Sequence, residues 1–240
     1  MEHKINFLHL QNLPIFEQLQ IEEALLRLNH ENWCIINEGS PPSIIMGISG
    51  KPEELVNALE MEKAPIPLIK RYSGGGTVIV DSNTLFVSFI FQKETFSFPC
   101  FPEPILRWSE ELYQKALNIE GFKLKENDYV IDNLKCGGNA QYIKKDRFVH
   151  HTTFLWDFKD EAMNYLLHPP KTPNYREGRS HTDFLTRLNL HISSKHDFIQ
   201  KVKKELESRF SLSEKKLNPL ISLLKQPHRK TTSHRFETDH

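Results

Sequence analysis

Three consecutive glycines in front of two strand-like runs place the strongest constraint on how this chain can fold. Residues 74–76 are all glycine, and the runs 77–80 and 85–91 that follow are rich in β-branched and aromatic residues. Successive glycines cost backbone entropy that the end of a strand does not normally carry. They are useful where the backbone adopts unusual dihedral angles or where a ligand comes close to it. A flexible hairpin connection remains the simpler interpretation of the glycines alone.

The residues around this run are suited to binding an anion. Exposed backbone N–H groups can donate to carboxylate or phosphate oxygens, and Arg71 adds a planar fork of donors. The candidate binding residues of this segment are Arg71, Ser73, Gly74, Gly75 and Gly76.

Helical and strand patterns are mixed along the rest of the chain. Apolar residues recur at helical spacing in 15–27, while 33–36 and 44–46 are short apolar runs bounded by turn residues. Further helices are expected at 105–116, 161–167 and 198–206, and further strands at 129–131, 148–149 and 154–156. Because helices and strands do not alternate regularly, we expect an α+β fold and not a doubly wound sheet.

Length and composition bound the domain organisation and the class of protein. The 240 residues fit one large domain or two small ones, and the periodicity weakens from about residue 211. We therefore expect one folded domain over 1–210 and a loosely ordered C-terminal tail over 211–240. Thirty-one basic residues balance 31 acidic ones, which gives no field that would attract nucleic acid or an anionic membrane. The absence of a secretory signal and of a CxxC pair predicts a cytoplasmic protein with reduced thiols.

A second cluster lies at 127–141 and also fits an anion. Lys135 comes just before Gly137 and Gly138, so its ammonium group can reach an anion lying against the glycine backbone. The carboxylate of Asp128 is a candidate ligand for Mg²⁺, which uses few protein oxygens together with phosphates. A turn with a solvated lysine is an equally good interpretation of this cluster alone.

Two further clusters are less specific. His150 and His151 are neighbours on an expected strand, so they point to opposite faces and cannot chelate one metal ion. The loop at 175–181 holds Arg176, Arg179 and His181, which could close over a polyanion such as triphosphate or could be merely solvated.

Taken together, in this order and spacing, the motifs resemble those of lipoate–protein ligases. The matching segments are IFEQLQIEEALLR from Ile15, MGISGKPEELVN from Met46, RYSGGGTVIVD from Arg71, END from Glu126, KCGGNAQ from Lys135 and HHTTFLWDF from His150. The resemblance spans residues 14–210 and implies the biotin/lipoate ligase catalytic-domain fold, a mixed, largely antiparallel sheet flanked by helices.

The resemblance also implies roles for individual residues. It implies that Lys135 holds the acid carboxylate and the adenylate phosphate, and that the segment 71–76 lines the acyl-adenylate site. Gly137, Ala140 and His151 match family positions around the acyl chain. Asn127 and Asp128 match positions on the nucleotide side, and Gly138 and Thr153 adjoin these two sets.

The activity implied is that of a lipoate–protein ligase. Such an enzyme activates lipoate or octanoate with ATP and Mg²⁺ as an acyl-adenylate and transfers it to a lysine of a lipoyl domain or an H-protein-like carrier. A separate accessory domain protein is an expected partner, because some members carry such a domain after the catalytic one. Two alternatives stay open: an ATP-independent octanoyl transferase with Cys100 or Cys136 as nucleophile, and a non-catalytic lipoyl- or adenylate-binding protein.

Overall fold

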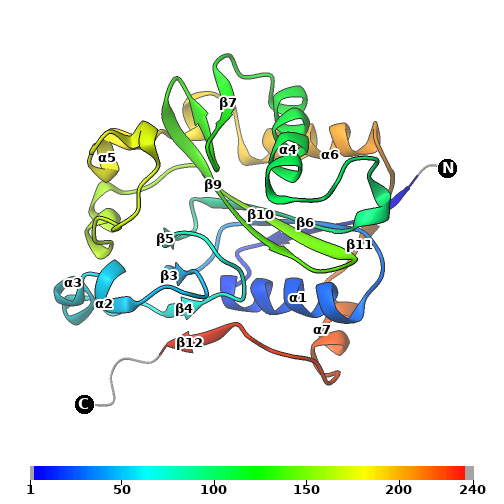
Figure 1. Ribbon diagram of the computed structural model, residues 1–240, viewed down its shortest axis with the longest axis horizontal. Coiled ribbons are helices and arrows are strands. Elements are labelled where there is room, and N and C mark those ends of the chain that lie inside the picture. Colours follow the sequence, from blue (N-terminus) through cyan, green and yellow to red (C-terminus); the bar gives the residue numbers. More distant parts are fainter. Residues whose placement is uncertain (1–2, 236–240) are drawn as a thin grey trace.

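The computed structural model of the chain describes residues 3–235, which form an eight-stranded sheet and a four-stranded sheet (Figure 1). The large sheet has the strand order β11-β1-β2-β6-β10-β9-β8-β7, and the small one has the order β12-β4-β3-β5. In the large sheet β1 pairs in parallel with β11 and with β2, and the other five pairings are antiparallel.

The strands of the described chain are short to medium in length. They are β1 (Lys4–Gln11), β2 (Trp33–Glu38), β3 (Ser43–Met46), β4 (Leu68–Lys70), β5 (Val78–Val80), β6 (Thr84–Gln92), β7 (Phe122–Lys125), β8 (Asp128–Ile131), β9 (Leu134–Ile143), β10 (Arg147–Leu155), β11 (Ser211–Lys215) and β12 (Ser233–Arg235).

The helices include three long ones. The α-helices are α1 (Ile15–Leu28), α2 (Pro52–Leu55), α3 (Ala58–Lys63), α4 (Pro102–Leu117), α5 (His181–Phe184), α6 (Lys195–Glu207) and α7 (Asn218–Leu224), and short 3₁₀ turns cover Lys93–Thr95, Asp160–Tyr165, Asn174–Arg176 and Leu188–Leu190. Within the described residues, none of these helices is long and apolar enough to cross a membrane.

The large sheet is covered on both faces, as Figure 1 shows for α4 and α6 on one side and α1 and α7 on the other. Strand β6 illustrates the cause, because side chains alternate between the two faces of a strand. Val87 and Phe89 pack in the core beneath α4 and α6, whereas Phe86 and Ile90 pack in the core beneath α1. The expected α+β fold with a mixed, largely antiparallel sheet is therefore confirmed.

The two runs after the glycines do not form a hairpin. Strand β5 pairs with β3 in the small sheet, while β6 pairs with β2 and β10 in the large one. The turn between them at 81–83 thus passes the chain from one sheet to the other. The runs at 148–149 and 154–156, expected to be separate, both contribute to β10, with residue 156 just beyond its end.

The C-terminal segment is more ordered than the sequence predicts. Strand β11 adds a parallel strand beside β1, α7 packs on α1, and β12 pairs antiparallel with β4. The expectation of a loosely ordered tail is therefore wrong for residues 211–235, and residues 236–240 lie outside the described chain. The sequence shows no clear periodicity here because these elements are short and bury few side chains; Leu220 is the buried residue of α7.

This packing makes a testable prediction about α7. Leu220 is 7% exposed and its neighbour Ile221 is 45% exposed. We expect Leu220→Ala to lower the free energy of unfolding by about 2 kcal/mol, because a buried leucine is replaced by a cavity. Ile221→Ala, as the matched control, should change it by less than about 0.5 kcal/mol. Urea unfolding measures both, and equal small effects would mean that α7 is not part of the folded unit.

Candidate functional site

Three neighbouring strands bring most of the candidate residues onto one face of the large sheet. Asp128 of β8 lies opposite Gly138 of β9, which lies opposite Thr153 of β10. Two residues further along, Ala140 lies opposite His151. Directly opposed residues of antiparallel strands share a face, so all five lie on the face on which α1 packs.

A β-bulge aims Lys135 at this face. Tyr129 pairs with Gly137 and Val130 pairs with Lys135, so Cys136 is left without an opposite residue. A bulge of this kind turns the neighbouring side chains. Cys136 consequently packs in the core beneath α4 and α6.

The Lys135 ammonium group lies at the centre of the candidate site. Its Nζ is 2.9 Å from Oδ1 of Asp128. It also lies 3.1 Å from the point that a Cβ on Gly138 would occupy. A side chain at Gly138 would displace the lysine, so the glycine leaves the space in which the ammonium group stands. The Lys135 side chain keeps 23% of its surface exposed and is accessible to a ligand.

Both oxygens of the Asp128 carboxylate are engaged. Oδ1 pairs with Lys135, and Oδ2 accepts a hydrogen bond of 2.9 Å from the hydroxyl of Tyr175. Burial and the negative charge of Asp128 raise the pKa of Tyr175, so the phenol keeps its proton and donates it. Tyr175 is not among the residues chosen from the sequence as candidates, because nothing in its local pattern marks a contact with β8.

Arg71 holds the glycine segment together. Its guanidinium donates to the carbonyl oxygens of Gly74 at 2.7 Å and of Gly76 at 2.9 Å, and to the Ser73 hydroxyl at 3.2 Å. Burial lowers the pKa of Arg71 to about 10, which leaves it charged at neutral pH. The donor fork expected for a ligand is thus used, in this state, to shape the loop itself.

The glycine segment lies close against β9. Gly75 has a φ of +107°, and a Cβ there would lie 3.6 Å from the Asn139 carbonyl oxygen and 3.9 Å from Cβ of Ala140. Gly47 also approaches closely, since a Cβ on it would meet the Gly75 carbonyl oxygen at 2.3 Å. The segment 73–76 and the motif 135–140, 60 residues apart in sequence, therefore come together as one site.

The two histidines point to opposite faces, as the strand geometry predicts. Nδ1 of His151 is 3.0 Å from Oε1 of Glu22 on α1 and 2.8 Å from the hydroxyl of Ser88 on β6. His150 is buried on the other face, stacked on Phe89, and burial lowers its pKa to about 3. His150 is therefore a neutral core residue, and His151 is the one on the site face.

The arginine-rich loop adjoins the site but is largely bonded to itself. Arg176 and Arg179 each donate from Nε to the other's carbonyl oxygen. Within the described chain, Nη2 of Arg176 is buried without a hydrogen-bond partner, so it remains a free donor. Burial and repulsion by Arg176, His168 and Lys135 lower the pKa of His181 to about 4, so it is neutral at pH 7. Asn127 is bonded from the opposite face, since its carbonyl oxygen accepts from the side-chain amide of Asn139, whose Oδ1 accepts from Thr152 on that face.

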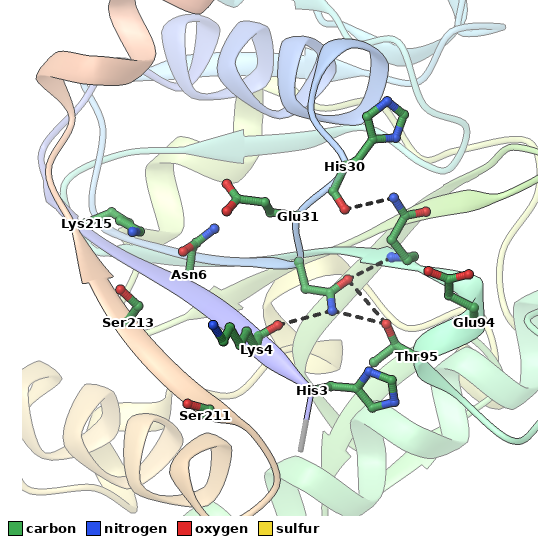
Figure 2. A pocket seen from close by; sticks show the side chains of 12 residues that line it. His3, Lys4, Asn6, His30, Glu31, Glu94, Thr95, Ser211, Ser213 and Lys215 are labelled. Carbon is green, nitrogen blue, oxygen red and sulfur yellow. Dashed lines mark hydrogen bonds between the residues drawn. The ribbon is translucent and has the colours of Figure 1, made fainter. Parts of the chain in front are cut away.

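Two surface hollows of the described chain lie largely outside this cluster. Figure 2 shows one of about 550 Å³ at the β11 and β1 edge of the large sheet, and none of the candidate residues lines it. A second, of about 450 Å³, is lined by residues 180–182 and so touches the candidate loop at His181. Chemistry and register, more than the size of a hollow, locate the candidate site.

The chain is similar in sequence to proteins of one known family. Residues 14–211 match the family model described as lipoyl protein ligase A/B catalytic domain. The chain is 31% identical to the inactive lipoate–protein ligase 2 of Plasmodium falciparum, over 85% of this chain and 70% of that protein. It is 34% identical to the lipoate-protein ligase LplJ of Bacillus subtilis, over 58% of this chain and 42% of that protein.

Solved structures share the fold. A lipoate-protein ligase A bound with ATP superposes with a TM-score of 0.76 at 19% identity, covering 94% of this chain and 93% of the other. One chain of a bi-partite lipoate protein ligase and E2 lipoyl domain system from Thermoplasma acidophilum gives 0.74 at 19% identity, covering 94% and 91%.

The glycine segment supplies a prediction that does not depend on activity. A Cβ at Gly75 would stand 2.7 Å from Nη2 of Arg71 in a left-handed backbone conformation, whereas Gly74 has open space around it. We expect Gly75→Ala to lower the free energy of unfolding by about 1–3 kcal/mol through strain and displacement of Arg71. Gly74→Ala, the control, should stay within about 0.5 kcal/mol of the parent. If urea unfolding gives the same result for both, the Arg71 geometry described above is incorrect.

Proposed function

The chain belongs to the lipoyl protein ligase A/B catalytic-domain family, and from that premise we propose that it is an ATP-dependent lipoate–protein ligase. It would convert lipoate or octanoate to acyl-AMP and transfer the acyl group to a lysine of a lipoyl carrier domain. One observation supports this most directly: the Lys135 ammonium stands over Gly138, on the sheet face that the glycine segment covers.

The first step makes a mixed anhydride. A carboxylate oxygen of the acid bonds to the α-phosphorus of ATP, and the bond to pyrophosphate breaks. Negative charge gathers where the two anions meet, and a fixed cation such as Lys135 lowers the energy of that arrangement. Backbone N–H groups of residues 74–76 are the proposed donors to the adenylate, and Arg176 offers a further donor to the departing phosphates.

Asp128 is the residue we propose for Mg²⁺, with one condition. Bound Mg²⁺ supplies positive charge to the phosphate oxygens and needs few protein ligands. Among the described residues no set of three carboxylate, histidine or cysteine side chains forms a metal site. A single carboxylate can supply one such ligand, because each Asp128 oxygen keeps a lone pair beyond its contact with Lys135 or Tyr175; the condition is that the ion is accommodated beside the ammonium group of Lys135, which repels it.

The second step passes the acyl group to the carrier. The amine of the acceptor lysine bonds to the carbonyl carbon of acyl-AMP, and the bond to the phosphate oxygen breaks. His151 and Ala140 are proposed to lie beside the acyl chain and its carbonyl, with Thr153 and Asn127 completing the two ends of the site. Gly137 turns to the opposite face, where a Cβ would meet Phe154 at 2.8 Å, so it would contribute only its backbone. The outcome is an amide bond on the carrier and free AMP.

The buried state of the cysteines argues against a cysteine-dependent transferase. Cys136 is fully buried, its thiol donates to the Tyr129 carbonyl oxygen, and burial raises its pKa. Cys100 is 6% exposed, and burial raises its pKa as well. A thiol nucleophile needs a low pKa and access to substrate, and neither residue has both.

The partners follow from the proposed reaction. A lipoyl domain or H-protein-like carrier would supply the acceptor lysine, and we propose no nucleic-acid or membrane partner. The match covers 42% of the length of LplJ, and we propose that adenylation either proceeds on this chain alone or needs a separate accessory domain protein. Residues 1–210 would form the catalytic unit, in a cytoplasmic setting, with residues 211–235 completing its sheets.

Whether the chain is active is the decisive question, because the Plasmodium falciparum relative is named inactive. The experiment is mass spectrometry of a lipoyl domain incubated with the chain, ATP, Mg²⁺ and lipoate or octanoate. A second reaction with supplied lipoyl-AMP separates transfer from adenylation. Acylation from lipoyl-AMP but not from ATP would indicate the need for an accessory domain. No acylation in either reaction, with tight binding of lipoyl-AMP, would favour the non-catalytic alternative.

Lys135→Ala is predicted to remove acylation from lipoyl-AMP and from ATP. Loss of one fixed group that stabilises developing charge typically lowers turnover by about 10²–10³-fold. Lys123→Ala on β7, an exposed lysine, is the control and should leave turnover unchanged. Thermal melting of both variants checks that the fold persists. Near-parental turnover in Lys135→Ala would remove the central element of the proposed mechanism.

The cysteine variants separate the two enzymatic alternatives. We expect Cys100→Ser and Cys136→Ser, singly and together, to keep substantial ATP-dependent acylation, because no thioester intermediate is needed. Intact-mass analysis of the parent after incubation with an octanoyl-carrier thioester should show no acyl adduct. Loss of activity in either variant, together with an acyl-thioester on the parental cysteine, would instead establish an octanoyl transferase.

A further inference from the structure

A fully buried carboxylate lies behind the site on helix α1. Glu22 is 0% exposed, and its Oε1 accepts hydrogen bonds from Gln18 at 2.8 Å and from Ser88 at 2.5 Å. Nδ1 of His151 lies 3.0 Å from Oε1 and 3.2 Å from Oε2. The hydroxyl of Tyr72 donates to Oε2 at 3.3 Å.

Such a group is expensive to bury, so its partners must offset the lost hydration. Burial alone would raise the pKa of Glu22. Attraction to His151 and hydrogen bonds from His151, Ser88 and Gln18 outweigh burial and lower it below its ordinary value. Glu22 is therefore a permanent anion at neutral pH, held by four side chains.

Two of those four side chains belong to the candidate site. Tyr72 lies inside the segment 71–76, between Arg71 and Ser73, and His151 lies on β10 opposite Ala140. Tyr72 is 1% exposed and packs edge-on against Tyr142 of β9, with ring centroids 5.6 Å apart. The one carboxylate thus contacts both the glycine segment and β10, the strand beside the one on which that segment lies.

The same contacts fix the protonation of His151 at one nitrogen. Its Nδ1 faces both oxygens of Glu22, and these can only accept, so Nδ1 carries a proton. The Nε2 atom is then the ring nitrogen left to face a ligand.

We propose that Glu22 is a positioning residue, which holds the glycine segment and His151 in register with each other without itself touching the substrates. This deepens the proposed function and rests on it for its catalytic consequence. The contacts of Glu22 with the glycine segment and with His151 exist in the ligand-free protein, so their effect on the segment can be tested without measuring activity.

The neighbouring residue provides a matched control. Glu23 is 1% exposed on the same helix, but its carboxylate accepts from the backbone N–H groups of Thr231 and Thr232 and pairs with Arg27. Glu22→Gln and Glu23→Gln each remove one buried charge from α1. Only the first removes it from the site.

The test is amide hydrogen exchange of the ligand-free variants. The reporters are the amides of Ile48 and Arg71, which donate to the carbonyl oxygens of Ser73 and Met46 and tie the segment to its neighbours. We expect Glu22→Gln to speed their exchange by at least about tenfold, the loss expected from one hydrogen bond to a charged group. Glu23→Gln should leave these amides unchanged and speed exchange at 231–232 instead. Tyr72→Phe should reproduce part of the Glu22→Gln effect at the two amides, and the double variant should add little to it, since the two residues share one interaction.

Steady-state acylation completes the test. For Glu22→Gln we expect the KM for lipoate to rise about tenfold with a smaller change in kcat, because the site is misaligned but its reacting groups remain. Glu23→Gln should keep parental constants.

Each outcome has one meaning. Exchange that rises equally throughout the Glu22→Gln protein, or not at all at the amides of Ile48 and Arg71, would overturn the proposal by showing a general structural role or none. A parent that neither acylates a lipoyl domain nor binds lipoyl-AMP would overturn the proposed function, while local exchange would still decide the role of Glu22.

Discussion

Backbone pairing between β9 and β10, with the bulge where β9 meets β8, is the constraint on which the rest of the site depends. A shift of one residue in this pairing would turn every side chain of the strand to the opposite face. The register puts Gly138 and Ala140 on the same face as His151. The bulge at Cys136 then brings Lys135 to that face and sends the thiol into the core. A single irregularity thus separates the proposed cation from the nearest alternative nucleophile.

The glycine segment is shaped by interactions that oppose its flexibility. Glycines lose much backbone freedom when they are fixed in one conformation, and Arg71 offsets this through charged donors to Gly74 and Gly76. Close approach to β9 requires the left-handed conformation at Gly75 and the missing side chain at Gly47. The loop can therefore lie on the sheet as a preformed cover, which reduces the ordering that ligand binding has to supply.

Buried charge is concentrated where function is proposed. Asp128 and Lys135 form an ion pair at this sheet face, Glu22 is a buried anion hydrogen-bonded to His151, and Arg71 is a buried cation beside them. Buried pairs are weak contributors to stability, because desolvation offsets much of their attraction. Their concentration is better explained by a site that must present fixed charges to an anionic intermediate.

The sequence by itself determined the α+β class, the long helices α1, α4 and α6, and the clusters at 71–76, 127–140 and 150–153, because period and residue chemistry are local properties. It could not show that β5 and β6 enter different sheets or that residues 211–235 complete both sheets, since short strands are stabilised by neighbours distant in sequence. It also missed Glu22, a carboxylate beside the apolar face of α1, and Ser88 and Tyr175, which have no local signal. Those contacts join residues that lie 47 to 129 positions apart in the sequence. Only the tertiary structure decides such pairings, because a buried polar group needs a hydrogen-bond partner and the fold determines which residues lie within reach.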